Sequence, residues 1–195
     1  MLYYFLESQY PRSGFISGGT TFIPPLTVNY LAMEDRLPEG TTAEVQLLSS
    51  VRRLKADYFE TTTGTRVVSD RLKSLLEQHS TGVQFIPATV SHHDGRPVGG
   101  SFWIAHHLAS LDVFDYEQSD YGRKAVIAAS VQQPPRKLVK VVSRIRLRQS
   151  EIGDREFFQL AYVNMPKPII SAAFYEICKA HKLNLHVTEV EDFNK

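Results

Sequence analysis

The sequence predicts an α+β fold with mixed sheet structure and two pseudo-repeated units of strand, helix and strand. The first observation is a pattern in residues 67–85 that returns without a gap in residues 169–187, each copy containing one segment of helical periodicity. The second is the alternation of apolar and polar residues in segments such as 138–147, which is the period of a strand. The third is that segments favouring strands outnumber those favouring helices, with the helices interspersed, as in α+β proteins.

The repeated pattern predicts the same element order twice. In the first copy a β-branched run ends at Ser69, and Leu72, Leu75 and Leu76 then form one apolar helix face. The matching face of the second copy, after Ser171, consists of Phe174, Ile177 and Cys178. We interpret both serines as N-caps, because a serine hydroxyl accepts a hydrogen bond from a free amide of the first helical turn.

Each unit is expected to close with a strand. The first closing strand covers residues 83–87 and is expected to end at Pro87, and the second covers residues 183–187. We interpret the ungapped match as a duplication. The alternative is chance similarity between two ordinary amphipathic units, and the sequence leaves it open.

The remaining elements follow from local composition. Residues 2–6 are aromatic and aliphatic and predict an opening strand. Residues 11–25 are rich in Gly, Ser, Thr and Pro and predict a long loop. Apolar residues in 43–54 lie near helical spacing, so a helix is expected there. The apolar segment 102–114 predicts one or two strands, and 138–147 predicts a strand or hairpin with one basic side.

Length and composition set the domain organisation and the compartment. The 195 residues predict a single domain, 1–195, which can contain two lobes built around the repeats at 57–90 and 155–190. Lys and Arg (22) balance Asp and Glu (21), which argues against a general polyanion binder. Cys178 is the single cysteine, so no intrachain disulfide can form, and this favours the cytoplasm. No signal peptide or membrane span is expected, and hence no membrane partner.

Two histidine doublets are the most visible candidates for chemistry. They are His92–His93, followed by Asp94, and His106–His107. Neighbouring residues of an extended chain point to opposite faces, so one doublet offers one ligand to each side. The sequence therefore predicts no catalytic residue, no metal site, no cofactor and no enzyme. The alternative that remains open is a small metal-dependent hydrolase using His92, His93, Asp94 and His106.

Two charged segments are candidates for binding a partner. Six bases lie between residues 136 and 148 without an acid among them, namely Arg136, Lys137, Lys140, Arg144, Arg146 and Arg148. Phosphates or a carboxylate-rich partner could bind such a face, but it has no aromatic residues. A nucleic-acid-binding module is therefore the second alternative, and nucleic acid is an unlikely partner. The other segment, 111–121, interleaves four carboxylates with Tyr116 and ends at Tyr121. This composition is common where one protein binds another.

Several short motifs occur in an order that resembles a known family. They are Asp57-Tyr58-Phe59, Val68-Ser69-x-x-Leu72, Gly82-Val83-x-Phe85-x-Pro87, Asp112-x-x-Asp115-x-x-x-Ser119-x-Tyr121 and Ile152-Gly153-Asp154. Together they are similar to the bacterial immunity protein eleven group of polymorphic toxin systems, over most of the chain. The resemblance implies a protein without enzymatic activity that binds a cognate secreted toxin inside the producing cell and occludes the toxin's active site.

The resemblance places binding residues less directly than it places the fold. Ser69, Pro87 and Ser119 are interpreted as structural, and Asp115 is compatible with either role. We expect the toxin contacts on the segments between the two copies, from Ser91 to Arg148. The candidate contact residues are Asp115, Tyr116, Glu117, Asp120, Tyr121, Arg144, Arg146 and Arg148. No feature predicts the oligomeric state.

Overall fold

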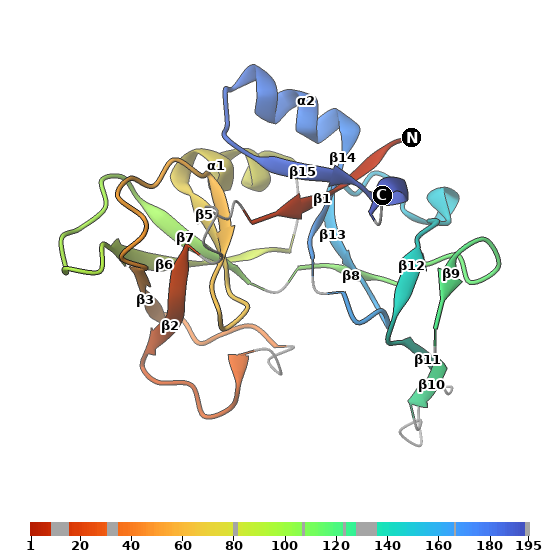
Figure 1. Cartoon of the computed structure of the whole chain (residues 1–195), viewed down its shortest axis with the longest axis horizontal. Coiled ribbons are helices and arrows are strands. Elements are labelled where there is room, and N and C mark those ends of the chain that lie inside the picture. Colours follow the sequence, from red (N-terminus) through yellow and green to blue (C-terminus); the bar gives the residue numbers. More distant parts are fainter. Residues whose placement is uncertain are drawn as a thin grey trace. The chain divides into compact units, whose positions relative to one another are not determined.

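A computed structural model describes residues 1–8, 16–30, 35–79, 82–106, 108–122, 124–127, 136–165 and 167–193 (Figure 1). The class is α+β with mixed sheets, as predicted, and the described part contains two α-helices. The chain folds into two compact units built from interleaved segments. The larger unit contains residues 7–108 and 176–186, and the smaller unit contains residues 1–6, 109–175 and 187–195. That the chain is one functional domain stays a prediction.

The larger unit is built on a six-stranded sheet. In spatial order its strands are β2 (Ser17–Ile23), β3 (Thr42–Leu47), β6 (Gln84–Ser91), β7 (Phe102–His106), β5 (Arg66–Ser69) and β4 (Tyr58–Glu60). The β3–β6 pair is parallel, and the other neighbours are antiparallel. The core of this unit includes Phe22, Val45, Val67, Ile86 and Ile104.

The free edge of β2 is covered by the turn between β4 and β5. The backbone N–H of Thr62 donates to the carbonyl of Gly18 at 3.1 Å, and the N–H of Thr20 donates to the hydroxyl of Thr63 at 3.1 Å. A Cβ atom on Gly19 would lie 3.2 Å from the Thr63 methyl group, so the turn approaches the strand closely at a residue without a side chain. The covering matters because an uncovered edge strand invites pairing with other chains.

Two predictions for this region are wrong. The expected loop 11–25 contains strand β2, in which Ser17 and Phe22 are buried. The expected helix in 43–54 is strand β3, whose side chains alternate between exposed and buried. Both segments pair with neighbours far away in the sequence, and these tertiary hydrogen bonds override a local composition that does not specify a strand.

The first predicted helix is confirmed. Helix α1 (Asp70–His79) lies against β5 and β7, with Leu72, Leu75 and Leu76 buried. The Ser69 hydroxyl accepts the N–H of Leu72 at 3.3 Å, which is the expected N-cap contact. Strand β6 follows the helix but does not end at Pro87, as predicted. It continues to Ser91 because its ladder with β3 starts only at Ala88, so the missing N–H of Pro87 removes no bond from that ladder.

The smaller unit is built on a five-stranded sheet. In spatial order its strands are β15 (His186–Glu189), β1 (Tyr3–Glu7), β14 (Ile169–Ser171), β13 (Phe157–Leu160) and β8 (Ser110–Leu111). Strand β1 confirms the predicted opening strand, and β7 and β8 confirm the strands expected in 102–114. Helix α2 (Ala172–Ala180) follows β14, and the Ser171 hydroxyl accepts the N–H of Phe174 at 3.0 Å. The core includes Phe5, Phe114, Ile145, Phe158 and Ile169.

The two predicted repeat segments have a common element order in the structure. The first is β5–α1–β6, with β7 lying between the two strands in the sheet. The second is β14–α2–β15, with β1 lying between the strands. The second closing strand begins at His186 and not at residue 183. That the two segments arose by duplication stays a prediction.

The predicted basic strand is divided between two small sheets. Strand β11 (Arg136–Val139) pairs with β10 (Lys124–Ile127), and β12 (Val142–Arg144) pairs with β9 (Asp120–Tyr121). The predicted alternation holds at the buried Val139 and Ile145 and fails at Val141, which is 63% exposed. The side chains of Arg136 and Lys137 lie outside the described part, as does His107. Neither described helix is long and apolar enough to cross a membrane.

Candidate partner-binding surface

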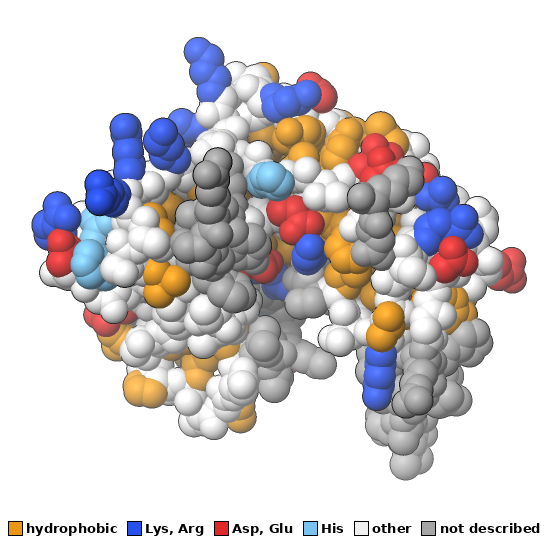
Figure 2. Space-filling view, viewed as in Figure 1, with side chains coloured by type: hydrophobic (Ala, Val, Ile, Leu, Met, Phe, Trp, Pro, Cys, Tyr) orange, Lys and Arg blue, Asp and Glu red, His pale blue; other side chains and the backbone are white. Residues whose placement is uncertain are grey.

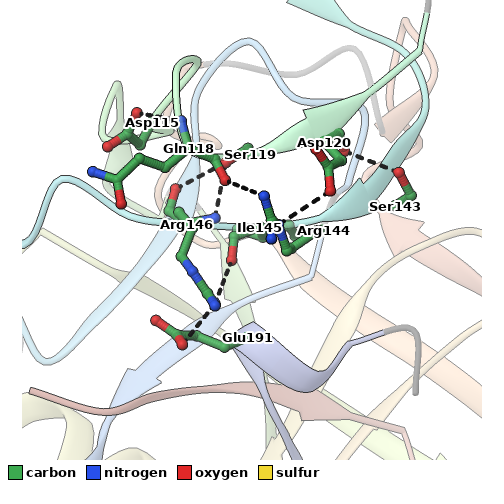
Figure 3. Close-up of polar contacts among 9 residues, drawn as sticks. All are labelled: Asp115, Gln118, Ser119, Asp120, Ser143, Arg144, Ile145, Arg146 and Glu191. Carbon is green, nitrogen blue, oxygen red and sulfur yellow. Dashed lines mark hydrogen bonds and ion pairs between the residues drawn. The ribbon is translucent and has the colours of Figure 1, made fainter.

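The structure brings the acidic-aromatic segment and the basic strand together in the smaller unit. Strand β9 pairs with β12, which places Tyr121 opposite Val142 and Asp120 opposite Arg144. An isolated bridge between Phe114 and Leu147 continues the contact. The candidate residues from both segments therefore form one surface, which we call the paired-charge surface. Figure 3 shows the part of it around Asp120, Arg144 and Arg146. Its members are Asp112, Asp115, Tyr116, Glu117, Asp120, Tyr121, Arg144, Arg146, Arg148 and Glu191.

Asp115 and Ser119 hold the turn that carries the acidic-aromatic segment. The Asp115 carboxylate accepts the backbone N–H groups of Glu117 at 2.9 Å and Gln118 at 3.0 Å, which is a typical Asp-initiated turn. The buried Ser119 hydroxyl accepts the N–H of Arg146 at 2.8 Å and donates to its carbonyl at 3.3 Å. Both side chains thus fix the local backbone, as the sequence predicted for Ser119.

Arg144 and Arg146 are engaged in ion pairs with half-exposed carboxylates. The Arg144 guanidinium lies 3.1 Å from the Asp120 carboxylate and donates to the carbonyl of Gln118 at 3.1 Å. The Arg146 guanidinium lies 2.6 Å from the carboxylate of Glu191, which is in a 3-10 helix (Val190–Asp192) near the C-terminus (Figure 3). These pairs were not visible in the sequence, because Asp120 and Glu191 are both distant along the chain from the arginines that they contact.

Arg148 bridges two carboxylates and two backbone carbonyls. Its Nε atom lies 2.8 Å from Glu151 without hydrogen-bond alignment, and its Nη2 atom lies 3.7 Å from the Asp112 carboxylate. The guanidinium also donates to the carbonyl of Phe114 at 3.0 Å and to that of Asp112. The three arginines are therefore not a free basic face, which weakens the nucleic-acid alternative because the paired carboxylates reduce the positive potential that attracts phosphates.

Aromatic side chains lie among the charged pairs. The rings of Phe114, Tyr116 and Tyr121 contact one another edge to face, with centroids 5.1 to 5.8 Å apart. Phe114 is fully buried, and the two tyrosines are half-buried. Burial, and then the Asp112 carboxylate, raise the pKa of Tyr116, so its hydroxyl stays neutral at physiological pH. The tyrosines thus offer rigid, amphipathic contact area.

A small depression adjoins this surface. It is partly open to solvent and is lined by Met1, Leu2, Tyr3, Leu147, Gln149, Val190 and Glu191. Leu2 is 48% exposed, and Glu191 belongs both to the depression and to the ion pair with Arg146. An apolar hollow beside half-exposed ion pairs is consistent with a protein-binding surface.

The histidines of the hydrolase alternative are not brought together. His106 pairs with Gln84 at the start of β6, whereas His92, His93 and Asp94 follow the end of that strand. Asp94 pairs with Arg96 at 2.8 Å, and its pKa is lowered by the hydrogen bonds from Arg96. Among the residues that the structure describes, no three His, Cys, Asp or Glu side chains are placed to hold a metal ion.

His106 has a structural environment. It is 3% exposed, with Nδ1 3.2 Å from the Tyr30 hydroxyl and Nε2 2.8 Å from the carbonyl of Asp35. A neutral ring that donates through Nε2 and accepts through Nδ1 satisfies both contacts. His106 therefore connects β7 to Tyr30 and Asp35, and Tyr30 packs against the core of the larger unit.

We expect the ionisation of the Tyr30 hydroxyl to lower the free energy of unfolding in alkaline solution. Burial raises the pKa of Tyr30 from 10.0 to about 12, although the charge of Arg66 acts in the opposite direction. Between these values the unfolded chain loses a proton that the folded chain keeps, so the free energy of unfolding falls as the pH rises. We expect a loss of about 2 kcal/mol between pH 10 and pH 12 that is absent in Tyr30→Phe. Urea unfolding of both proteins across this range measures it, and equal pH slopes would contradict the assignment.

A second charged cluster was missed by the sequence analysis. The larger unit exposes Arg52, Arg53 and Lys55 in the segment between β3 and β4, and exposes Lys182 and Arg71 beside them. We call these five residues the basic patch. Asn184 donates from Nδ2 to the carbonyl of Lys55 at 2.9 Å, and Arg71 donates to the carbonyl of Lys182 at 2.8 Å, which joins the three segments. Figure 2 shows Lys and Arg side chains gathered at the upper left of the view.

The run Arg52-Arg53-x-Lys55 was a visible signal for this patch. It lies outside residues 91–148, on which the toxin contacts were expected. Lys182 could not be added from the sequence, since only the fold brings it to a segment more than a hundred residues away.

The chain matches a known protein family. A family model described as "Immunity protein family (Imm11)" matches residues 9–191 of the chain. The search of curated proteins found no match.

Proposed function

Since this chain belongs to the Imm11 immunity protein family, we propose that it binds one cognate toxin tightly and covers the toxin's active site. Membership of this family implies a toxin-neutralising role in a bacterial polymorphic toxin system. The binding acts inside the producing cell, in the cytoplasm, and needs no catalysis, metal or cofactor. The paired-charge surface of the smaller unit makes the contact.

The observation that carries the proposed contact is the pairing of β9 with β12. This pairing joins the two candidate segments into one surface that combines half-buried tyrosines with half-exposed ion pairs. Tyr and Arg are the residue types that most often dominate binding energy at protein interfaces. Exposed ion pairs contribute little to folding, so the arginines can exchange their partners for carboxylates of a bound protein at small cost.

The function is tested by the growth of cells that express a toxin whose gene neighbours the gene for this chain. We expect the toxin to stop growth alone and to be tolerated when the chain is co-expressed. The purified chain should form a complex with the toxin on size exclusion and abolish its activity in proportion to the amount added, as expected for occlusion. Absence of both rescue and complex formation would contradict the proposed function.

A separate experiment tests whether the chain covers the toxin's active site. A chain that covers the active site competes with the toxin's substrate, so saturating substrate slows formation of the complex. Equal association rates with and without substrate would indicate that the chain binds elsewhere on the toxin. The neutralising role would then stand while the occlusion mechanism would not.

A further inference from the structure

The basic patch of the larger unit differs from the arginines of the paired-charge surface, because only Arg71 among its five residues has an ion-pair partner in the described part of the chain, namely Asp57 at 3.5 Å. Arg52, Arg53, Lys55 and Lys182 are exposed and form no ion pair with any residue in the described part of the chain. Arg144, Arg146 and Arg148 each contact a carboxylate. The basic patch thus presents four exposed cations without a carboxylate partner in the described part of the chain.

The backbone beneath the patch is held by Asp57 and Asn184. The Asp57 carboxylate accepts the N–H of Asn184 at 2.7 Å, and the Asp57 N–H donates to the Asn184 carbonyl at 3.2 Å. Asn184 in turn binds the carbonyl of Lys55, and Arg71 binds the carbonyls of Lys182 and His181. The cations therefore project from a backbone that is already ordered before any partner arrives, which lowers the entropy cost of binding.

Asp57 pairs with Arg71 of the patch but with none of the other four cations. Asp57 is 8% exposed, and its carboxylate is occupied by the Ser69 hydroxyl at 2.5 Å, by Asn184 and by Arg71 at 3.5 Å. Glu176 is paired with Lys179 at 2.5 Å. The outer cations consequently produce a positive field that a partner of opposite charge can use.

We propose that the basic patch binds a carboxylate-rich surface of the toxin, an inference that rests on the proposed function. Arginine and lysine at the rim of an interface mainly accelerate association and select partners by charge. Nucleic acid fits less well, because residues 50–57 and 181–184, which carry four of the five cations, include no Phe, Tyr or Trp on which bases could stack. The chain as a whole also has a net charge of only +1.

Kinetics of toxin binding test the patch. The variant Arg52→Gln/Arg53→Gln/Lys55→Gln removes three cations, and Arg36→Gln/Arg96→Gln/Arg155→Gln removes three exposed cations elsewhere. At low salt, about 20 mM NaCl, we expect the patch variant to associate about tenfold more slowly than the control variant. The difference should shrink at about 300 mM NaCl, where the Debye length is short. Equal rates for both variants would overturn the proposal.

A second arm separates this inference from the proposed function. Binding of a poly-glutamate peptide and of a short DNA duplex is measured with the unaltered chain, the patch variant and the control variant. If poly-glutamate binding weakens about tenfold in the patch variant and not in the control variant, the result supports an acidic partner. This holds even when no toxin complex forms, because the missing complex would count only against the proposed function. Duplex binding that persists at about 150 mM NaCl and depends on the patch would overturn the proposal in favour of nucleic acid.

Discussion

Replacing Asp57 by alanine lowers the free energy of unfolding by about 3 kcal/mol, the largest effect we expect from a single polar substitution in the larger unit. The Asp57 carboxylate joins three parts of the unit, since it accepts from the Ser69 hydroxyl at 2.5 Å, from the N–H of Asn184 at 2.7 Å and lies 3.5 Å from Arg71. Alanine leaves the part-buried contacts of the Ser69 hydroxyl and the Asn184 N–H, and the exposed Arg71 guanidinium, without this acceptor. Urea unfolding followed by Trp103 fluorescence and circular dichroism measures the loss.

Two variants serve as controls for Asp57. Asp154→Ala removes an exposed carboxylate and should change the free energy of unfolding by less than about 0.5 kcal/mol. Ser69→Ala removes the helix cap and one partner of Asp57 and should cost about 1 kcal/mol. The double variant Asp57→Ala/Ser69→Ala should cost less than the sum, because the two residues share a hydrogen bond. An Asp57→Ala variant as stable as Asp154→Ala would show that the three contacts are not important for folding.

Tyr116→Ala and Tyr121→Ala should each weaken toxin binding by about 2 kcal/mol, roughly thirtyfold in Kd. The two rings contact each other at 5.8 Å and lie beside the Arg144–Asp120 and Arg148–Asp112 pairs. Aromatic anchors surrounded by charged groups commonly provide most of the binding energy at an interface. Isothermal titration calorimetry of the variants with the purified toxin measures the change, and circular dichroism verifies their folding.

Tyr175→Ala is the matched control for these tyrosines. Tyr175 is also half-buried and packs on another tyrosine, with its ring centroid 5.2 Å from that of Tyr4, but it lies outside the paired-charge surface. We expect its toxin affinity to stay within about threefold of the unaltered chain. If all three variants bind equally well, the contact surface lies elsewhere on the chain, whether or not the protein neutralises a toxin.

The parts of the fold that were predicted correctly are those with a strong local signal. Helix α1 has a capping serine at position 69 and an apolar face at helical spacing, so its limits follow from local hydrogen bonding and amphipathicity. Strand β1 likewise follows from a short aromatic and aliphatic run. Strands β2 and β3 were not predicted, because their stability comes from pairing with each other and with β6.

The candidate surface was predicted in pieces. The acidic-aromatic segment and the basic strand were both identified from composition, yet the sequence analysis treated them as separate faces. The ladder between β9 and β12 makes them one surface, and the fold pairs the arginines with carboxylates of the acidic-aromatic segment and with Glu191. Which charges are neutralised depends on distances that only the fold sets.

The sequence by itself determined the α+β class, both helices with their serine caps, and the family. These depend on local periodicity, on hydrogen bonds within a few residues and on motif order, all of which can be read along the chain. Only the tertiary structure decided that Arg144, Arg146 and Arg148 lie beside Asp120, Glu191 and Asp112, while Arg52, Arg53 and Lys55 form no ion pair within the described residues. The physical reason is that an ion pair requires two charges within a few ångströms, and residues this far apart in the sequence reach such distances only through the packing of the whole unit.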